Sequence, residues 1–268
     1  MHDVKLIAFY LPQFHPIPEN DAWWGSGFTE WVNVRRARPN FVGHYQPHVP
    51  AELGYYDLRA PETRAAQAEL ARQHGIHGFC YYHYWFNGRR LLERPLNAVI
   101  ESGEPDFPFC VCWANENWSR RWDGGNDELL IAQEYSAEHE RRFIEGLLPV
   151  LEDRRYIRVG GRPLLLVYRA NLLPEPRRAA ETFRRVARIA GVGETMPRVH
   201  PAPGVAGSRC IGFRRRGRVP AARARRGAAD RSGRKDQSDV QRRGSGITFP
   251  LPRTRWSALR GRTGSFAA

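Results

Sequence analysis

Long apolar runs, cysteines and a leader-like amino terminus are scarce or absent in this sequence. No run of about 18 apolar residues occurs, so the sequence predicts no membrane-spanning helix. The first residues, MHDVKLIAFYLPQFHP, contain one lysine, a very short apolar stretch and no small-residue cleavage site, so they do not resemble a secretory signal peptide. Of the four cysteines, Cys110 and Cys112 alternate within an apolar run instead of forming a CxxC motif. This spacing indicates core residues and not metal ligands or disulfides, and we expect a cytoplasmic protein.

Acidic residues are nearly missing from the last quarter of the chain. Residues 198–268 hold 18 of the 42 basic residues but only 3 of the 28 acidic ones, so the other 24 basic and 25 acidic residues leave 1–197 almost neutral. The net charge of +14 therefore resides in this tail. We expect a folded domain over 1–197 and a tail over 198–268 that is irregular or disordered, because an arginine-rich segment with few long apolar runs buries too little surface to offset its ordering entropy.

The basic tail raises the alternative of a nucleic-acid-binding protein. Its charge suits contacts to phosphates, but the tail has few aromatic residues, no helical stripe and no known nucleic-acid-binding motif. A charge run alone is a weak indication of function. We therefore expect no specific nucleic-acid partner, and sequence-selective binding by the tail would reverse that expectation.

Apolar segments alternate with amphipathic segments in the first 197 residues. Near-continuous apolar strands separated by helices predict an α/β fold with a parallel sheet buried on both faces, either doubly wound or a (β/α)8 barrel. No GxGxxG or GxxxxGK[ST] motif follows a strand, so we expect no nucleotide cofactor. Polar and aromatic clusters follow the first three strands, where barrel enzymes keep their active sites, and this favours a partial (β/α)8 TIM barrel of about four βα units. The expected strands are 5–12, 75–86, 107–114 and 162–170, and the expected helices are 61–75, 89–102, 136–153 and 176–191.

The stretch FCVCWANENW (109–118) begins as the third strand and ends on polar groups. Glu116 next to tryptophans such as Trp118 would be partly desolvated and suited to protonate a glycosidic oxygen. Asn115 would hydrogen-bond a sugar hydroxyl, and Arg121 and Asp123 would do the same or bind an anionic group. The alternative is a glutamate–arginine network that only fixes a loop. We expect Glu116 to be catalytic.

The segment DAWWGSGFTEWVNV (21–34) is rich in aromatic residues for a loop. Trp23, Trp24 and Trp31 offer flat faces that stack on a pyranose, and Glu30 offers a carboxylate for its hydroxyls. The alternative is a loop packed by its own aromatic side chains.

The second strand contains YYHYWF (81–86), with aromatic residues at both parities. Either Tyr82 with Tyr84, or His83 with its alternate neighbours, faces the barrel interior. We include Tyr82 and His83 among the candidate substrate-binding residues, although His83 is equally well explained as a core histidine. The histidines show no metal-ligand spacing such as HExxH, so we expect no metal.

Four long motifs resemble one known family. YLPQFHPIPENDAWWGSGFTEWVNV, HYQPHVPAELGYYDLR, GFCYYHYWFNGRRLLERPL and CVCWANENWSRRWDG, within a match from about Lys5 to Gly191, resemble the WbsX-type proteins of bacterial polysaccharide clusters. That family is named as glycosyltransferases and described as having a domain like the family-99 glycoside hydrolases. The resemblance implies a (β/α)8 barrel that works on a glycan or activated sugar in O-antigen or capsule assembly, and it leaves transfer and hydrolysis open. The Asn-Glu pair is also similar to the acid/base element of retaining barrel glycosidases, which follows the fourth strand there and the third here.

After about residue 197 the sequence departs from that family. The family continues with a Gly-Phe-Asp … Glu-Phe-Pro-Pro segment, whereas Gly212-Phe213 is followed here by RRRGRVPAA. With one choice of GC-rich codons, reading one base later converts RRRGRVPAA into DAAVEFPP, which restores the family motif. Our hypothesis is that the tail is an out-of-frame translation and that the chain is an inactive fragment. The genomic DNA around the codon for Phe213 tests it.

Overall fold

The computed structural model of the protein describes residues 4–120 and 128–199. In this part of the chain, five parallel strands form one sheet in the order β1-β2-β4-β8-β9. Neighbouring strands in the sheet follow one another in the same order as in the chain, as they do in a (β/α)8 barrel. In a doubly wound sheet, by contrast, the strand order reverses near the middle of the sheet. The α/β class and the partial barrel are therefore confirmed. The strands are β1 (Leu6–Tyr10), β2 (Ile76–Phe86), β4 (Phe109–Trp113), β8 (Arg162–Val167) and β9 (Met196–Val199).

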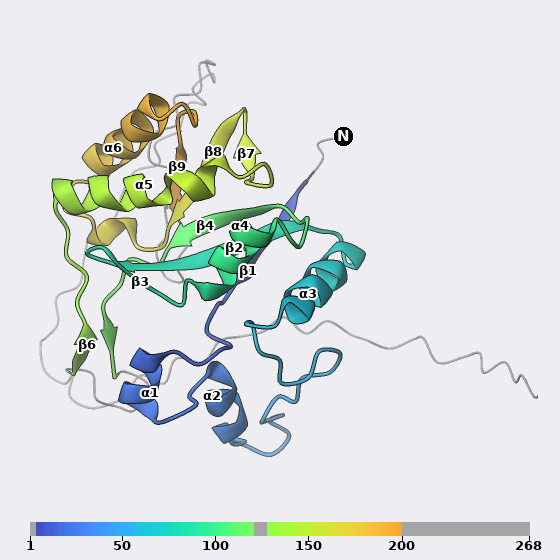
Figure 1. The fold of residues 1–268 in the computed structure, drawn as a ribbon. Coiled ribbons are helices and arrows are strands. Elements are labelled where there is room, and N and C mark those ends of the chain that lie inside the picture. Colours follow the sequence, from blue (N-terminus) through green and yellow to red (C-terminus); the bar gives the residue numbers. More distant parts are fainter. Residues whose placement is uncertain (1–3, 121–127, 200–268) are drawn as a thin grey trace, which may run out of the picture. The chain divides into compact units, whose positions relative to one another are not determined.

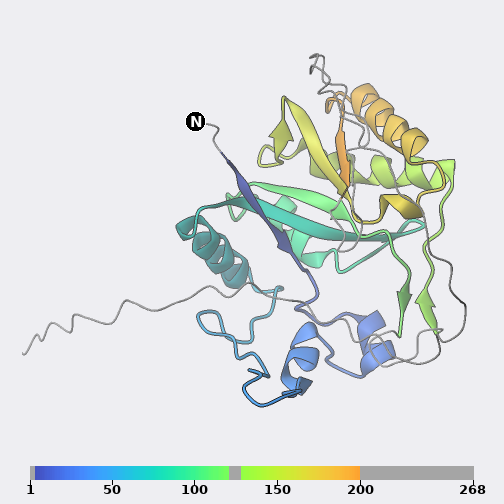
Figure 2. The ribbon, with the colours of Figure 1, turned by 180° about the vertical axis from the view of Figure 1, so that it is seen from behind.

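Helices pack on one face of this sheet. Helices α4 and α5 lie in front of the sheet in Figure 1 and behind it in the reverse view of Figure 2. Trp113 of β4 is fully buried and stacks on Phe143 of α5, with 4.2 Å between the ring centroids, and Phe183 of α6 closes the same core. The helices are α3 (Pro61–Gln73), α4 (Arg94–Ser102), α5 (Ala137–Glu152) and α6 (Pro176–Ile189).

Helix α5 starts where the sequence predicts. Ser136 is the N-cap, and its hydroxyl accepts a hydrogen bond from the backbone N–H of His139 at 3.1 Å. Pro149 lies inside the helix, which continues to Glu152.

The helix expected over 89–102 is wrong in its first turn. Residues Arg89–Leu91 form strand β3, which pairs antiparallel with β2. Asn87 and Gly88 both have positive φ, 53° and 102°, and an Asn-Gly pair with this geometry forms a two-residue hairpin turn. Helix α4 begins only at Arg94, with a proline in its first turn, and ends at Gly103, which is left-handed.

Three further elements were not predicted. The loop after β1 contains two seven-residue helices, α1 (Pro18–Trp24) and α2 (Glu30–Arg36), which are too short to show a sustained period. Strand β9 is the fifth parallel strand; its four residues, MPRV, carry little apolar signal.

Short antiparallel segments complete the structure: β5 (Trp118–Ser119) pairs with β6 (Leu129–Ile131), β7 (Arg158–Val159) pairs with β8, and a 3-10 turn, η2, spans Ala170–Leu172. Within the described residues, none of the helices has the length and apolar character needed to cross a bilayer. The expectation of an irregular tail falls on residues that, apart from 198 and 199 in β9, lie outside the described range.

Candidate functional site

The two faces of β2 differ in their surroundings, and this settles which aromatic set faces away from the helices. His83 is buried on the helix side, 6.0 Å from the Phe143 ring, and burial lowers the pKa of its imidazole to about 3. Tyr82 and Tyr84 lie on the opposite face, and Tyr82 stacks on Phe9 of β1 with 5.5 Å between the ring centroids. Of the two parities left open by the sequence, Tyr82 with Tyr84 occupies the face that forms the interior of a barrel.

Glu116 lies just beyond the carboxyl end of β4, as expected. Its Oε1 accepts a hydrogen bond at 2.7 Å from Nη1 of Arg169, which follows β8. Both side chains are about one-third exposed, at 36% for Glu116 and 33% for Arg169, so the pair is reachable from solvent. The neighbouring ends of two parallel strands thus bring together a carboxylate and a guanidinium 53 residues apart in sequence.

Asn115 fixes the backbone of Arg169, the partner of Glu116, through its side chain. Its side chain is fully buried; Oδ1 accepts from the backbone N–H of Arg169 at 2.8 Å, and Nδ2 donates to the backbone carbonyl of Arg169 at 2.9 Å. Nδ2 of Asn115 also donates to the hydroxyl of Tyr135, and this hydroxyl donates to the backbone carbonyl oxygen of Asn115. These bonds connect the chain after β4 to the chain after β8. The Asn115 amide is therefore engaged in hydrogen bonds within the protein. Its expected hydrogen bond to a sugar hydroxyl stays a prediction.

A row of aromatic side chains leads toward Glu116. Trp23 of α1 meets Trp118 edge-on at 5.8 Å, and Trp118 meets Tyr84 at 5.0 Å. Tyr84 is followed by Tyr82, whose ring lies 5.9 Å from that of Tyr168. Burial first, and then the negative charge of Glu116, raise the pKa of the Tyr168 hydroxyl. We call these five side chains, Trp23, Trp118, Tyr84, Tyr82 and Tyr168, the aromatic row.

The other candidates in the loop after β1 lie apart from the Glu116–Arg169 pair. Trp31 packs against the loop's own aromatic residues, and its indole N–H donates to the backbone carbonyl of Tyr56 at 2.7 Å. The guanidinium carbon of Arg120 lies over the Trp24 ring, 5.1 Å from the ring centroid. Burial raises the pKa of the Glu30 carboxyl, which accepts a hydrogen bond from Asn33 at 3.2 Å.

Two candidates, Arg121 and Asp123, lie outside the described residues. Conversely, Tyr168 and Arg169 were not among the candidates, because the sequence placed them inside the strand expected over 162–170, whereas β8 ends at Val167 and both residues follow it directly. The rule that site residues follow the ends of barrel strands identifies both only when this strand is ended at Val167.

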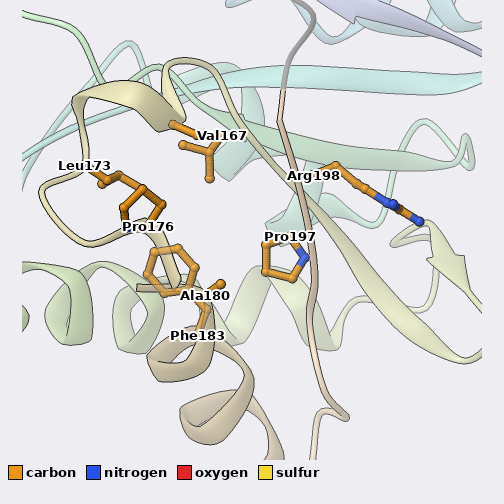
Figure 3. A pocket seen from close by; sticks show the side chains of 8 residues that line it. Val167, Leu173, Pro176, Ala180, Phe183, Pro197 and Arg198 are labelled. Carbon is orange, nitrogen blue, oxygen red and sulfur yellow. The ribbon is translucent and has the colours of Figure 1, made fainter. Parts of the chain in front are cut away.

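An apolar cavity lies elsewhere, between β8, β9 and α6 (Figure 3). Phe183 and Ala180 of α6 face Val167, and Leu173 and Pro197 close the space. Its volume of about 10 Å³ is at the lower limit for one water molecule. A larger groove of about 410 Å³ lies beside β1 and α3. Neither is lined by Glu116.

A parallel sheet that carries a solvent-reachable Glu–Arg pair and aromatic side chains at the carboxyl ends of its strands has the layout of a barrel enzyme. The sequence comparison then gives the family. The chain belongs to the family described as glycosyltransferase WbsX, whose family model matches residues 6–235. This match extends beyond residue 197, where the sequence was expected to depart from the family.

Relatives and similar structures are of two kinds. The proteins named WxcX from Xanthomonas campestris pv. campestris strains B100 and ATCC 33913 are each 54% identical over 189 residues, which cover 70% of this chain and 27% of the relative. The chain thus spans about a quarter of the length of these relatives. Two structures of the GH99 endo-alpha-mannosidase from Bacteroides thetaiotaomicron have TM-scores of 0.40 (with BIS-TRIS-propane) and 0.44, at 14% and 13% identity. They cover 74% of this chain and 53% and 56% of the mannosidase chains.

Proposed function

We propose that the described sheet carries part of the active site of a carbohydrate-active enzyme of bacterial surface polysaccharide metabolism, located in the cytoplasm. The substrate is a glycan or an activated sugar, and the reaction is glycosyl transfer or glycoside hydrolysis. The observation that carries this proposal is the position of Glu116: it is partly exposed at the carboxyl end of β4, contacted by Arg169 and followed by the aromatic row. Membership of the WbsX family supports it.

Glu116 acts at the glycosidic oxygen. In its protonated form it donates a proton to the leaving oxygen while the bond from that oxygen to the anomeric carbon breaks. The Glu116 carboxylate that results takes the proton of the water or acceptor hydroxyl whose oxygen forms the new bond to the anomeric carbon. Arg169 sets the direction of the carboxyl group through its contact with Oε1. Asn115 is a positioning residue, because its amide fixes the backbone of Arg169 on both the N–H and the carbonyl side.

The aromatic row supplies the sugar-binding surface. Tyr82 and Tyr168 lie near enough to Glu116 for its charge to act on both hydroxyls. The half-buried Trp118 and Trp23 extend the row away from Glu116, and Tyr84, between Trp118 and Tyr82, is buried. Aromatic faces stack on the C–H face of a pyranose, while the tyrosine hydroxyls meet its polar edge. This arrangement fits an extended glycan chain better than a single sugar.

The test is Glu116→Gln, introduced at the matching position of a longer family member, where turnover is measured, and in this chain, where glycan binding is measured. Loss of a positioned acid should lower the turnover rate about 10²–10⁴-fold. Glycan affinity should stay within about threefold of that of the unmodified protein, because the aromatic row is intact. The control is Glu138→Gln on α5, where the carboxylate pairs with Arg141 on the surface. Unchanged turnover in the Glu116 variant would remove this residue from the mechanism.

A further inference from the structure

Four large apolar side chains are exposed in the loop between α2 and α3, and we call them the apolar tip. They are Phe41 (66% exposed), Val42 (103%), Tyr45 (62%) and Val49 (62%). Because Val42 is fully exposed, this part of the loop projects from the surface. In Figures 1 and 2 the loop extends away from the sheet, on the side remote from α6. Apolar side chains that are exposed together in one loop mark an interaction site.

Contacts within the loop hold the apolar tip in this position. The Phe41 ring stacks on the imidazole of His44 with 4.7 Å between the ring centroids, and the Tyr45 ring meets that of His48 edge-on at 4.9 Å. The Tyr45 hydroxyl accepts a hydrogen bond from the backbone N–H of Val49 at 3.5 Å. Local contacts thus fix the aromatic rings while leaving them exposed.

The chain around the apolar tip carries charge of one sign. Arg35, Arg36 and Arg38 are exposed just before the tip, and no aspartate or glutamate occurs between Glu30 and Glu52. The surface of a bilayer that contains anionic lipids attracts such arginines, and each strengthens binding about fivefold. Exposed apolar side chains next to a basic cluster are typical of a segment that lies in the membrane interface.

We propose that the apolar tip inserts into the interface of a bilayer that contains anionic phospholipids, and that the three arginines contact the lipid phosphates. A protein partner would need a matching surface of roughly 800 Å². A projecting tip of four side chains instead suits the shallow burial of about 5–10 Å that interfacial segments reach. Tyr45 fits this depth, because its ring is apolar and its hydroxyl is polar. The proposal rests on this loop and not on the catalytic role of Glu116.

The experiment is flotation of the full chain with vesicles of phosphatidylglycerol and phosphatidylethanolamine in equal parts. Phe41→Asp and Val42→Asp should each weaken binding at least about tenfold, while circular dichroism shows an unchanged fold. The matched control is Ile189→Asp on α6, which adds the same charge at an apolar position that is 78% exposed. The basic residues after 197 also attract anionic lipids, so this comparison separates insertion of the tip from adhesion by charge.

Two further variants test the arginines and the depth of insertion. Arg36→Gln should weaken binding about fivefold at low salt, and clearly more than the control Arg177→Gln, which removes an exposed arginine of α6. Vesicles with brominated acyl chains quench a tryptophan that enters the bilayer. Val42→Trp should therefore add fluorescence that these vesicles quench, whereas the fluorescence added by Ile189→Trp should not be quenched.

Three outcomes overturn the proposal. The first is absence of binding, or equal weakening by Val42→Asp and Ile189→Asp. The second is a dimer of the full chain without vesicles that Val42→Asp abolishes, which makes a second copy the occupant. The third is a vesicle-free monomer in which iodide fails to quench the fluorescence added by Val42→Trp, because another part of the chain then covers the tip. None of these readouts depends on whether the Glu116 variant loses turnover.

Discussion

Replacing Asn115 with alanine should be among the most destabilising polar substitutions in the described part of the chain. The change deletes the acceptor of the Arg169 N–H at 2.8 Å and the donor to the Arg169 carbonyl at 2.9 Å. Each buried polar group left without a partner costs about 1–3 kcal/mol. Because the two groups belong to one residue and relax together, we expect a loss of about 2–4 kcal/mol in the free energy of unfolding. For a domain of about 150–250 residues this corresponds to about 5–15 °C in Tm.

The assay is urea unfolding followed by tryptophan fluorescence, with Asn117→Ala as the control. Asn117 has an exposed side chain and accepts one hydrogen bond, from the Gln133 N–H at 2.7 Å, so its loss should cost about 1 kcal/mol or less. If Asn115→Ala were no more destabilising than Asn117→Ala, the described link between the ends of β4 and β8 would be refuted. The role of Asn115 in orienting Arg169 toward Glu116 would fail with it.

Three further predictions concern stability. His83 has a pKa of about 3 in the folded protein and about 6.5 in the unfolded chain, so between these values only the unfolded state binds the proton. Stability should therefore fall as the pH drops from 6.5 toward 3, by up to about 1.4 kcal/mol per pH unit. Urea midpoints at several pH values should show a shallower fall for His83→Gln, and the same fall as in the unmodified protein for the exposed control His48→Gln. Trp113→Ala should lower the free energy of unfolding by about 3–5 kcal/mol, because the indole is fully buried and stacked in the core. Trp118→Ala should lower it clearly less in the same assay, because Trp118 is half-buried. Equal losses for the two variants would contradict the assignment of Trp118 to the site. Ser136→Ala should lower Tm by an amount equivalent to about 1 kcal/mol through loss of the α5 cap, and an unchanged Tm would show that the cap contributes nothing.

The main strands and helices could be predicted because parallel strands buried on both faces read as continuous apolar runs. FCVCW is such a run and becomes β4. Strand β9 carries too few apolar residues to be recognised, and α1 is too short to show a helical period. The β2–β3 hairpin is a different case, since the Asn87-Gly88 signal was present in the sequence and was not used.

The site could be located only in part from the sequence. Glu116 was found because it follows a strand directly, but its partner Arg169 is 53 residues away and is brought near only by the pairing of β4 with β8. The parity of YYHYWF could not be decided, because aromatic residues occupy both faces of β2: Tyr82 faces the barrel interior, and Trp85 packs against α5. Contacts between distant segments, which set both features, leave no local pattern in the sequence.

The central claim is that a glycan binds at the carboxyl ends of β2, β4 and β8. The most direct measurement is hydrogen exchange of the full chain with and without an oligosaccharide repeat unit of the producing bacterium's surface polysaccharide, read peptide by peptide. The account predicts slower exchange in the segments that contain Tyr84, Glu116 and Arg169, and no change over α3. Protection confined to residues 200–268, or to the α3 side of the sheet, would contradict it.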